Sequence, residues 1–300
     1  MKMVAWSEIA QICNRIDFPK SAVMCFERCY EQIFPKYAEA LQLYAAKWMS
    51  VDGDWRDCLK TISSIASDIG VSFNKASMFF LLYCAVLLRQ EYQRRELPES
   101  LYWDTLQDLR YKLLECYSLY KEWGTFVIEW FRGFYLCERF ALGRLQYEKS
   151  TFPYKGYKDI LKEGDNVYSC HIPSSGALLE NDVLISLKKA YTFYQGELRN
   201  GILPVVCHSW LLYKPLETAF ADSCNILRFR GMFDVIENAA DSKNEDFWRV
   251  FNQEFSPQSL NEILPTTSLQ KNLKTHLLDG GTLGNGFGVL LFDGEKIIDI

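Results

Sequence analysis

The hydrophobic pattern of this 300-residue chain changes its period near residue 140. Before that point apolar residues recur every three or four positions, which is typical of amphipathic helices. From Leu142 to Glu148 apolar and polar residues alternate, which is typical of a strand. A chain of this length is long enough for two domains. We therefore predict an α+β protein with an all-helical bundle over residues 1–140 and a mixed α/β domain over residues 141–300.

The first half contains several helix-period stripes with start and stop signals. The clearest stripe begins at Trp55 and ends at Gly70, and Ser72 is a suitable cap for the next helix. That next helix should run through the apolar block Met78–Leu88 and stop before Pro98, because the residue before a proline disfavours helical geometry. Three further helical stretches are predicted on the same grounds, at residues 37–48, 99–120 and 123–135.

The second half shows strand signals separated by turns and three helical segments. Strands are predicted at 142–148, 166–172, 205–212 and 225–233. The first two should pair antiparallel, and the third, apolar on both faces, should be central. Helices are predicted at 181–199, 245–251 and 268–278. Asp293-Gly294 between two apolar runs indicates a closing hairpin, preceded by a flexible glycine-rich loop at 280–288.

Composition limits the function classes. The net charge is −5 and no strongly basic run occurs, so nucleic acid is not an expected partner. Met1–Trp6 lacks the apolar core of a secretion signal. The longest apolar run, Met78–Leu88, is shorter than the about 20 residues of a membrane span. We therefore expect a cytoplasmic protein that does not insert into membranes.

The ten cysteines are scattered through apolar stretches, so we predict reduced thiols. No Cys-x-x-Cys pair occurs. Cys25 and Cys29 share a helical face, but no histidine or second cysteine pair follows at ligand spacing, so no structural metal is predicted.

The chain has three histidines, His171, His208 and His276. The first two lie in polar insertions within apolar strands, and imidazole is suited to general-base chemistry near neutral pH. The alternative is that both are core histidines bonded to the backbone. Neighbouring residues on a strand point to opposite faces, so neither Cys170-His171 nor Cys207-His208 can act as a nucleophilic pair. A cross-strand pair of Cys207 with His171 stays open.

Four segments together resemble a known family: Leu142-Gly-Arg-Leu-Gln-Tyr-Glu148, His171-Ile-Pro-Ser-Ser-Gly176, Cys207-His-Ser-Trp-Leu-Leu212 and Ser223-Cys-Asn-Ile-Leu-Arg-Phe229. Their order and spacing resemble bacterial acyltransferases that carry a helical N-acyltransferase N-terminal domain and a GNAT-like C-terminal domain. The fourth segment departs from the family's Ser-Asn-Ile, because Cys224 replaces the serine. The usual pyrophosphate loop, Gln/Arg-x-x-Gly-x-Gly/Ala, is kept only in its first half, at 228–233.

The resemblance implies a GNAT-like fold, acyl-coenzyme A as donor and an unidentified small-molecule amine as acceptor. It makes His208 the first candidate base and His171 the second. Ser209 and Asn225 are candidate substrate-binding residues, and Arg228 and Arg230 are candidate cofactor-binding residues. His171, His208 and Asn225 are expected to line one cleft.

Two other function classes remain open at this point. Loss of the pyrophosphate loop favours a non-catalytic GNAT-like binding module. A cysteine-dependent hydrolase would require a thiol of low pKa in an open cleft.

Overall fold

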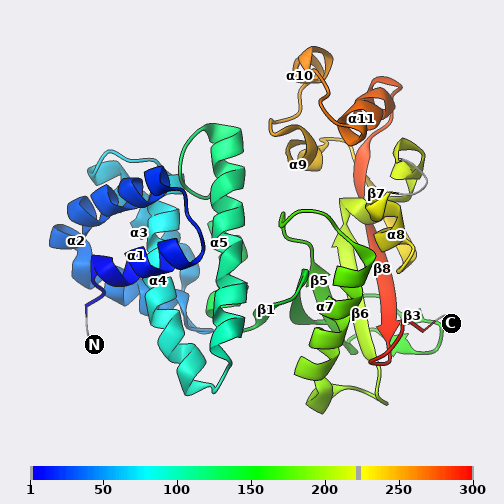
Figure 1. Ribbon diagram of the computed structural model, residues 1–300, viewed down its shortest axis with the longest axis horizontal. Helices are drawn as coiled ribbons and strands as arrows, with labels where there is room; N and C mark the ends of the chain where they lie inside the picture. The colour runs from blue at the N-terminus through cyan, green and yellow to red at the C-terminus, as the bar shows by residue number, and fades with distance from the viewer. Residues whose placement is uncertain (1–2, 221–223, 299–300) are drawn as a thin grey trace. The chain divides into compact units, whose positions relative to one another are not determined.

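The computed structural model describes residues 3–220 and 224–298 and divides into two compact units, Met1–Phe140 and Ala141–Ile300 (Figure 1). The first unit is built from helices and the second from a mixed sheet with helices, which confirms the predicted fold class.

The first unit is a helical bundle around one buried helix. Its α-helices are α1 (Trp6–Arg15), α2 (Lys20–Trp48), α3 (Trp55–Asp68), α4 (Phe73–Arg94), α5 (Glu99–Tyr120) and the short α6 (Arg132–Tyr135). α4 packs against α1, α2, α3 and α5 and is buried on nearly all sides from Ala76 to Leu88. An apolar helix of this kind needs neighbours around its whole circumference, and the other helices supply them.

Helix α4 begins as predicted, whereas the helix predicted over residues 123–135 was wrong. The Ser72 hydroxyl accepts a hydrogen bond from the Lys75 N–H at 3.2 Å, confirming the cap. Between residues 123 and 135 only the 3₁₀ turn η1 (Ile128–Phe131) and α6 are helical. The reason is a close approach: a Cβ on Gly124 would lie 2.6 Å from the Asn74 carbonyl carbon. The Thr125 N–H also bonds to the Asn74 carbonyl at 3.0 Å.

The second unit contains a six-stranded sheet in the order β1-β2-β5-β6-β8-β7. These strands are β1 (Arg139–Leu142), β2 (Leu145–Thr151), β5 (Asn166–His171), β6 (Leu203–Ser209), β7 (Asp234–Asp241) and β8 (Leu283–Phe292). β3 (Gly156–Tyr157) and β4 (Leu161–Lys162) form a separate small ribbon. β2 pairs antiparallel with β5 and β6 is central, as predicted.

Each face of the sheet has its own cover. α7 (Glu180–Phe193) lies across one face (Figure 1), where the Tyr147 and Ser186 hydroxyls are 3.3 Å apart. On the opposite face, Phe152 and the β3–β4 segment pack on Val167, Val206 and Val289.

The remaining short helices of the second unit are α8 (Asn225–Arg230), α9 (Trp248–Phe251), α10 (Pro257–Glu262) and α11 (Ser268–Leu278). α9, α10 and α11 gather at one end of β7 and β8 around a separate apolar cluster (Figure 1).

One strand prediction in this unit was wrong, and one strand was not predicted. Residues 225–230 form α8 rather than a strand, because one helical turn brings Ile226 and Leu227 against the apolar cluster while Phe229 contacts the Phe233 ring. β7 was missed. It is an edge strand with mostly exposed side chains, so burial imposes little alternation on its sequence.

The predicted flexible loop at 280–288 was also wrong, because the strand β8 starts at Leu283. Gly284, Gly286 and Gly288 alternate along β8 on one face. A Cβ on Gly286 would lie 2.4 Å from the Leu212 carbonyl oxygen, and one on Gly288 would lie 2.8 Å from the Phe233 Cβ. The glycines therefore let the segment after β6 pack directly on the strand backbone. The closing hairpin forms a turn at Asp293–Lys296 but only one bridge beyond it within the described residues, Phe292 with Ile297.

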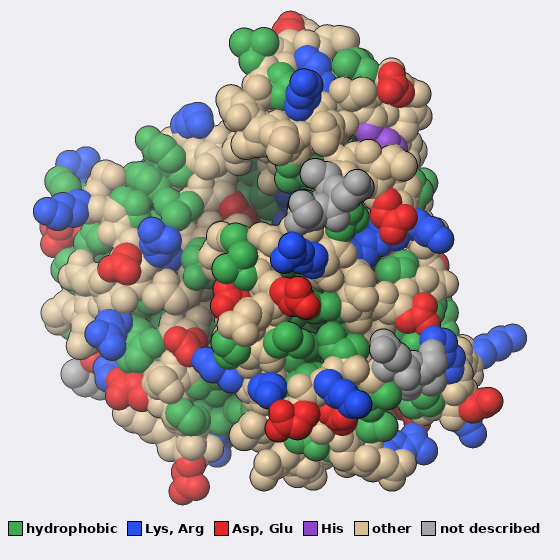
Figure 2. All heavy atoms as spheres, turned by 45° about the vertical axis from the view of Figure 1, so that its right-hand side comes forward, with side chains coloured by type: hydrophobic (Ala, Val, Ile, Leu, Met, Phe, Trp, Pro, Cys, Tyr) green, Lys and Arg blue, Asp and Glu red, His purple; other side chains and the backbone are tan. Residues whose placement is uncertain are grey.

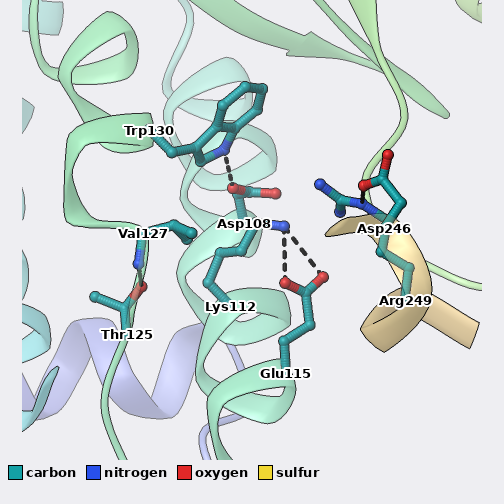
Figure 3. A network of polar contacts seen from close by, with 8 residues as sticks. All are labelled: Asp108, Lys112, Glu115, Thr125, Val127, Trp130, Asp246 and Arg249. Carbon is teal, nitrogen blue, oxygen red and sulfur yellow. Dashed lines mark hydrogen bonds and ion pairs between the residues drawn. The ribbon is translucent and has the colours of Figure 1, made fainter. Parts of the chain in front are cut away.

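Polar contacts also tie short segments together within each unit (Figure 3). In the first unit the Trp130 indole N–H donates to Asp108 at 2.8 Å, and Lys112 pairs with Glu115 at 2.9 Å. In the second unit Arg249 pairs with Asp246 at 2.5 Å. These bonds connect groups within one helix, or from a helix to a 3₁₀ turn of the same unit.

All ten cysteines are free thiols, eight of them buried. On the face seen in Figure 2, Lys and Arg side chains are interspersed with Asp and Glu. Among the described helices none is both long and apolar enough to cross a membrane by itself; α3 and α4 pass that test only jointly, across a bend of 118°.

Candidate active site

The parallel strands β5 and β6 separate toward their C-terminal ends. Within the described residues their register comprises two pairs, Tyr168 with Val205 and Ser169 with Val206, although β5 continues to His171 and β6 to Ser209. At the same ends, β5 stays paired with β2 and β6 stays paired with β8. The sheet is therefore forked here, and the facing backbone edges of the two strands are not bonded to each other.

The register decides which side chains share a face at this fork. His171 lies two residues beyond Ser169 and His208 two beyond Val206, so both histidines are on the same face at matching positions. Cys170 and Cys207 are on the opposite face, the one covered by α7. The cross-strand pair of Cys207 with His171 is thus ruled out by geometry.

The two cysteines also lack the features of a nucleophile. Both are about 99% buried, with exposed fractions of 1% each. A hydrogen bond with the Cys207 thiol, together with burial, raises the pKa of the Cys170 thiol well above its usual range. A hydrolase based on the Cys170 thiol would need the opposite shift.

His171 has an acidic partner that the sequence did not reveal. Its Nε2 lies 2.8 Å from Glu148 Oε1 on the neighbouring strand β2. The two side chains keep exposed fractions of 22% and 24%, so the pair is partly buried yet reachable from solvent. Glu148 is diagonal to His171 in the antiparallel register, a position that side chains of this length can bridge. A carboxylate so placed orients an imidazole and stabilises its protonated form.

The other histidines differ from His171 in their surroundings. His208 is exposed and lies opposite Phe287 of β8. Ser209, the next residue and a predicted substrate-binding residue, has a structural contact. Its hydroxyl oxygen accepts a hydrogen bond from the Leu211 N–H at 3.2 Å, which caps the following 3₁₀ turn η3 (Trp210–Leu212). His276 on α11 lies 3.2 Å from the Thr282 carbonyl oxygen, a structural contact away from the fork.

The remaining predicted site residues all lie on α8. Asn225 is its first residue and is half-buried, and no hydrogen bond joins it to either fork histidine among the residues described. Arg228 is exposed. Arg230 is buried, with its Nη1 3.0 Å from Glu217 Oε1, and burial lowers the pKa of its guanidinium. The charge of Arg230 is thus balanced inside the domain. Ser223, which opens the fourth motif, lies outside the described residues.

An arginine organises the loop between β5 and α7. Arg144 donates to three carbonyl oxygens of that loop, those of Pro173 at 3.0 Å, Gly176 at 2.8 Å and Ala177 at 3.1 Å. In a trans peptide the C=O and the following N–H point in opposite directions. The N–H groups of Ala177 and Leu178 therefore point away from the guanidinium. They lie just ahead of the α7 N-terminus, whose cap residue Leu179 offers no side-chain acceptor.

This loop has the context that a phosphate-binding loop requires, a strand followed by a turn and a helix N-terminus. Gly176 takes a φ of +99°, which a glycine adopts readily. The signal was visible in the sequence as a glycine between a strand and a helix. The sequence motif instead predicts the first half of such a loop at residues 228–233, of which 228–230 belong to α8.

Comparison with known protein families decides the classification. The family model of the GNAT-like C-terminal domain matches residues 140–290, and that of the N-acyltransferase N-terminal domain matches residues 7–137. The chain belongs to this acyltransferase family. The resemblance noted from the four sequence segments is thereby confirmed. No curated protein sequence matches the chain significantly.

Several solved structures of acyltransferases share the fold of this family member. One, in complex with decanoyl-CoA and teicoplanin, superposes with a TM-score of 0.76 at 20% identity, covering 96% of this chain and 88% of that one. Another, with decanoyl-CoA, has a TM-score of 0.76 at 22% identity and the same coverage. A third, with CoA and 10C-teicoplanin, has a TM-score of 0.73 at 20% identity, covering 93% and 86%.

Proposed function

We propose that this protein is an acyl-CoA-dependent N-acyltransferase whose reaction takes place at the fork between β5 and β6. The observation that carries the proposal is the His171–Glu148 pair at the open end of that fork, in a chain of the GNAT-like acyltransferase family. The acyl-CoA and CoA complexes of structurally similar acyltransferases support the same donor here.

The donor thioester would lie in the fork. Because β5 and β6 do not pair beyond Ser169 and Val206, their edges offer amides and carbonyls to an extended amide-containing chain such as the pantetheine arm. The pyrophosphate would then reach the loop after β5, where Arg144 turns the Ala177 and Leu178 N–H groups outward. Exposed Arg228 is kept as a second candidate contact for the phosphates.

The reaction assigned to the fork is the transfer of an acyl group from the thioester sulfur to the amine nitrogen. The amine nitrogen attacks the thioester carbonyl carbon, a C–N bond forms, and the C–S bond breaks to release coenzyme A thiolate. His171 takes the proton from the amine, and Glu148 holds the imidazole in position and stabilises the cation that forms. His208, on the same face of the adjoining strand, is the second candidate for this proton transfer, and Ser209 and Asn225 remain candidate contacts for the acceptor.

A non-catalytic GNAT-like binding module is the alternative. Its main support was the missing pyrophosphate loop, and the loop after β5 supplies suitable geometry for one. The alternative still predicts ligand binding without turnover. It is therefore separated from the enzyme by kinetics and not by affinity.

The decisive experiment combines binding and turnover on the full-length chain. Thermal stabilisation is measured with coenzyme A thioesters from acetyl to decanoyl, and thiol release is then followed with a panel of primary amines that includes teicoplanin. We expect stabilisation by at least one thioester and amine-dependent thiol release. Arg144→Gln should weaken stabilisation by coenzyme A, because the loop loses its clamp. Stabilisation without release for every amine would favour the binding module, and no stabilisation at all would refute the donor site.

A further inference from the structure

A hollow on the helical unit contains a pair of cysteines that the acyltransferase chemistry does not use. Its volume is about 380 Å³, and it is lined by Cys25 and Cys29 of α2 together with Arg28, Val71 and Lys75. Cys25 is half-buried and Cys29 is buried. The hollow therefore exposes one sulfur atom beside two cationic side chains.

The neighbours of Cys25 favour its ionised form. The Cys29 thiol donates a hydrogen bond to the Cys25 sulfur, and the positive charges of Lys75 and Arg28 add to this effect. Together they lower the pKa of the Cys25 thiol to about 6. Partial burial and, to a smaller extent, the nearby Glu122 carboxylate oppose this lowering of the pKa. The carboxylate also accepts hydrogen bonds from the Ser72 hydroxyl at 2.6 Å and the Asn74 amide at 2.8 Å. Partly exposed thiolates in electropositive surroundings are the reactive cysteines of proteins.

We propose that Cys25 is an oxidation site of this protein, at which hydroperoxides convert the thiolate to a sulfenic acid within the hollow formed by α2 and the start of α4. The sulfur attacks one peroxide oxygen, an S–O bond forms and the O–O bond breaks. Sulfur loses two electrons, and the other oxygen leaves as hydroxide from hydrogen peroxide, or as alkoxide from an organic hydroperoxide, and takes a proton from solvent to become water or an alcohol. Cys29 stays a thiol and donates its hydrogen bond to the oxidised sulfur.

Helix geometry keeps this product from closing to a disulfide. Residues four apart on a helix have Cβ atoms about 5–6 Å apart. A relaxed disulfide needs about 3.5–4.5 Å between them. Closure would require α2 to unwind at its buried face, where Ala22, Phe26 and Cys29 are packed. The sulfenic acid is therefore the expected end state at low peroxide concentrations.

The test uses the full-length reduced protein with hydrogen peroxide as the oxidant. One equivalent is added at pH 7 in the presence of dimedone, and adducts are located by mass spectrometry of peptides. Cys224 is the internal control, because it is the other half-buried cysteine and the remaining eight are buried. We expect the adduct at Cys25 to exceed that at Cys224 by roughly 10-fold or more. Equal labelling of the two cysteines, or a Cys25–Cys29 disulfide as the main product, would overturn the proposal.

Charge variants test the stated cause. The rate of iodoacetamide alkylation at Cys25 should rise with pH through about 6, in place of its ordinary value of 9.0. Cys29→Ala should slow alkylation at pH 6.5 by roughly 10-fold, and Lys75→Gln by roughly 2- to 5-fold. Lys60→Gln, an exposed charge change on α3, is the matched control and should have no effect. If thermal melts show that Cys29→Ala does not fold, the test rests on Lys75→Gln. An unchanged pH profile of Cys25 alkylation in this folded variant would contradict the inference.

Discussion

Two buried tyrosine hydroxyls of the helical unit and one histidine–carboxylate pair of the sheet unit differ in the kind of hydrogen-bond partner that they have. In the helical unit, the buried Tyr102 and Tyr135 hydroxyls each donate to a carbonyl of α4, those of Ala85 at 2.9 Å and Leu81 at 2.6 Å. In the sheet unit, His171 and Glu148 bond to each other at an open end of the sheet. A polar group satisfied by backbone is fixed and serves stability. Two titratable groups that satisfy one another, and can be reached, are available for chemistry.

The largest expected effect tests the sheet side of this comparison. His171→Ala should lower turnover with a coenzyme A thioester by roughly 10²–10⁴-fold, because the base for the amine is lost. The melting temperature should change little, since the side chain is partly exposed and removing it leaves no fully buried orphan group. His208→Ala carries the same expected range if His208 is the base in place of His171. Steady-state kinetics and melting must be measured on the same preparations.

Two controls sharpen that result. Glu148→Gln keeps a hydrogen-bond acceptor near His171 but removes the charge, so turnover should fall less than in His171→Ala. Coenzyme A binding should be unchanged in all three variants, because the imidazoles act on the amine. If His171→Ala unfolds the protein without a selective kinetic defect, the His171–Glu148 pair has a structural role. It would then resemble the buried tyrosine hydroxyls of the helical unit.

A second, intermediate effect concerns packing in the sheet unit. Gly286→Ala should destabilise the protein by about 3 kcal/mol, because the new Cβ would lie 2.4 Å from the Leu212 carbonyl oxygen. Gly196→Ala is the matched control, since no atom lies within 4 Å of its added Cβ. The control should stay within about 1 kcal/mol of the wild type in urea unfolding. Equal stability of the two variants would show that β8 can move away from η3.

The fold was predictable from the sequence where local residues determine an element, and not where contacts between distant segments do. Helix α3 is amphipathic and capped by Asp54, and α5 begins directly after Pro98, so the bounds of both follow from nearby positions. The errors arose where distant backbone decides. Gly124 against Asn74 and Gly286 against Leu212 are contacts between segments far apart in the chain. The edge strand β7 carries mostly exposed side chains and so shows no alternation.

The candidate site was predictable only in part, for a related reason. His171 and His208 stood out as rare titratable residues in apolar strands, and the structure gives them matching positions on one face. Glu148 did not stand out, because a carboxylate in a strand usually lies on the solvent-exposed face of the sheet. Its proximity to His171 depends on the β2–β5 register, which the sequence does not show. Arg144 was likewise ordinary until its three carbonyl partners were known.

The smallest expected effect tests the helical side, with two hydroxyl groups of opposite status. The Tyr102 hydroxyl is buried and bonded to the Ala85 carbonyl, whereas the Ser77 hydroxyl on α4 is buried with no hydrogen-bond partner in the part of the chain that the structure describes. Tyr102→Phe should destabilise by about 1 kcal/mol, because the carbonyl loses its side-chain donor.

Ser77→Ala should do the reverse and stabilise by about 1 kcal/mol, since it removes an unpaired buried hydroxyl and introduces a better helix former. Both values come from urea unfolding followed by circular dichroism, with an unchanged slope as the condition for comparing midpoints. If Ser77→Ala also destabilises the protein, the Ser77 hydroxyl makes a hydrogen bond in solution. The helical core would then leave fewer buried polar groups without a partner than the structure indicates. If Tyr102→Phe is neutral, the backbone bond contributes nothing net, and burial of the ring alone fixes Tyr102 against α4.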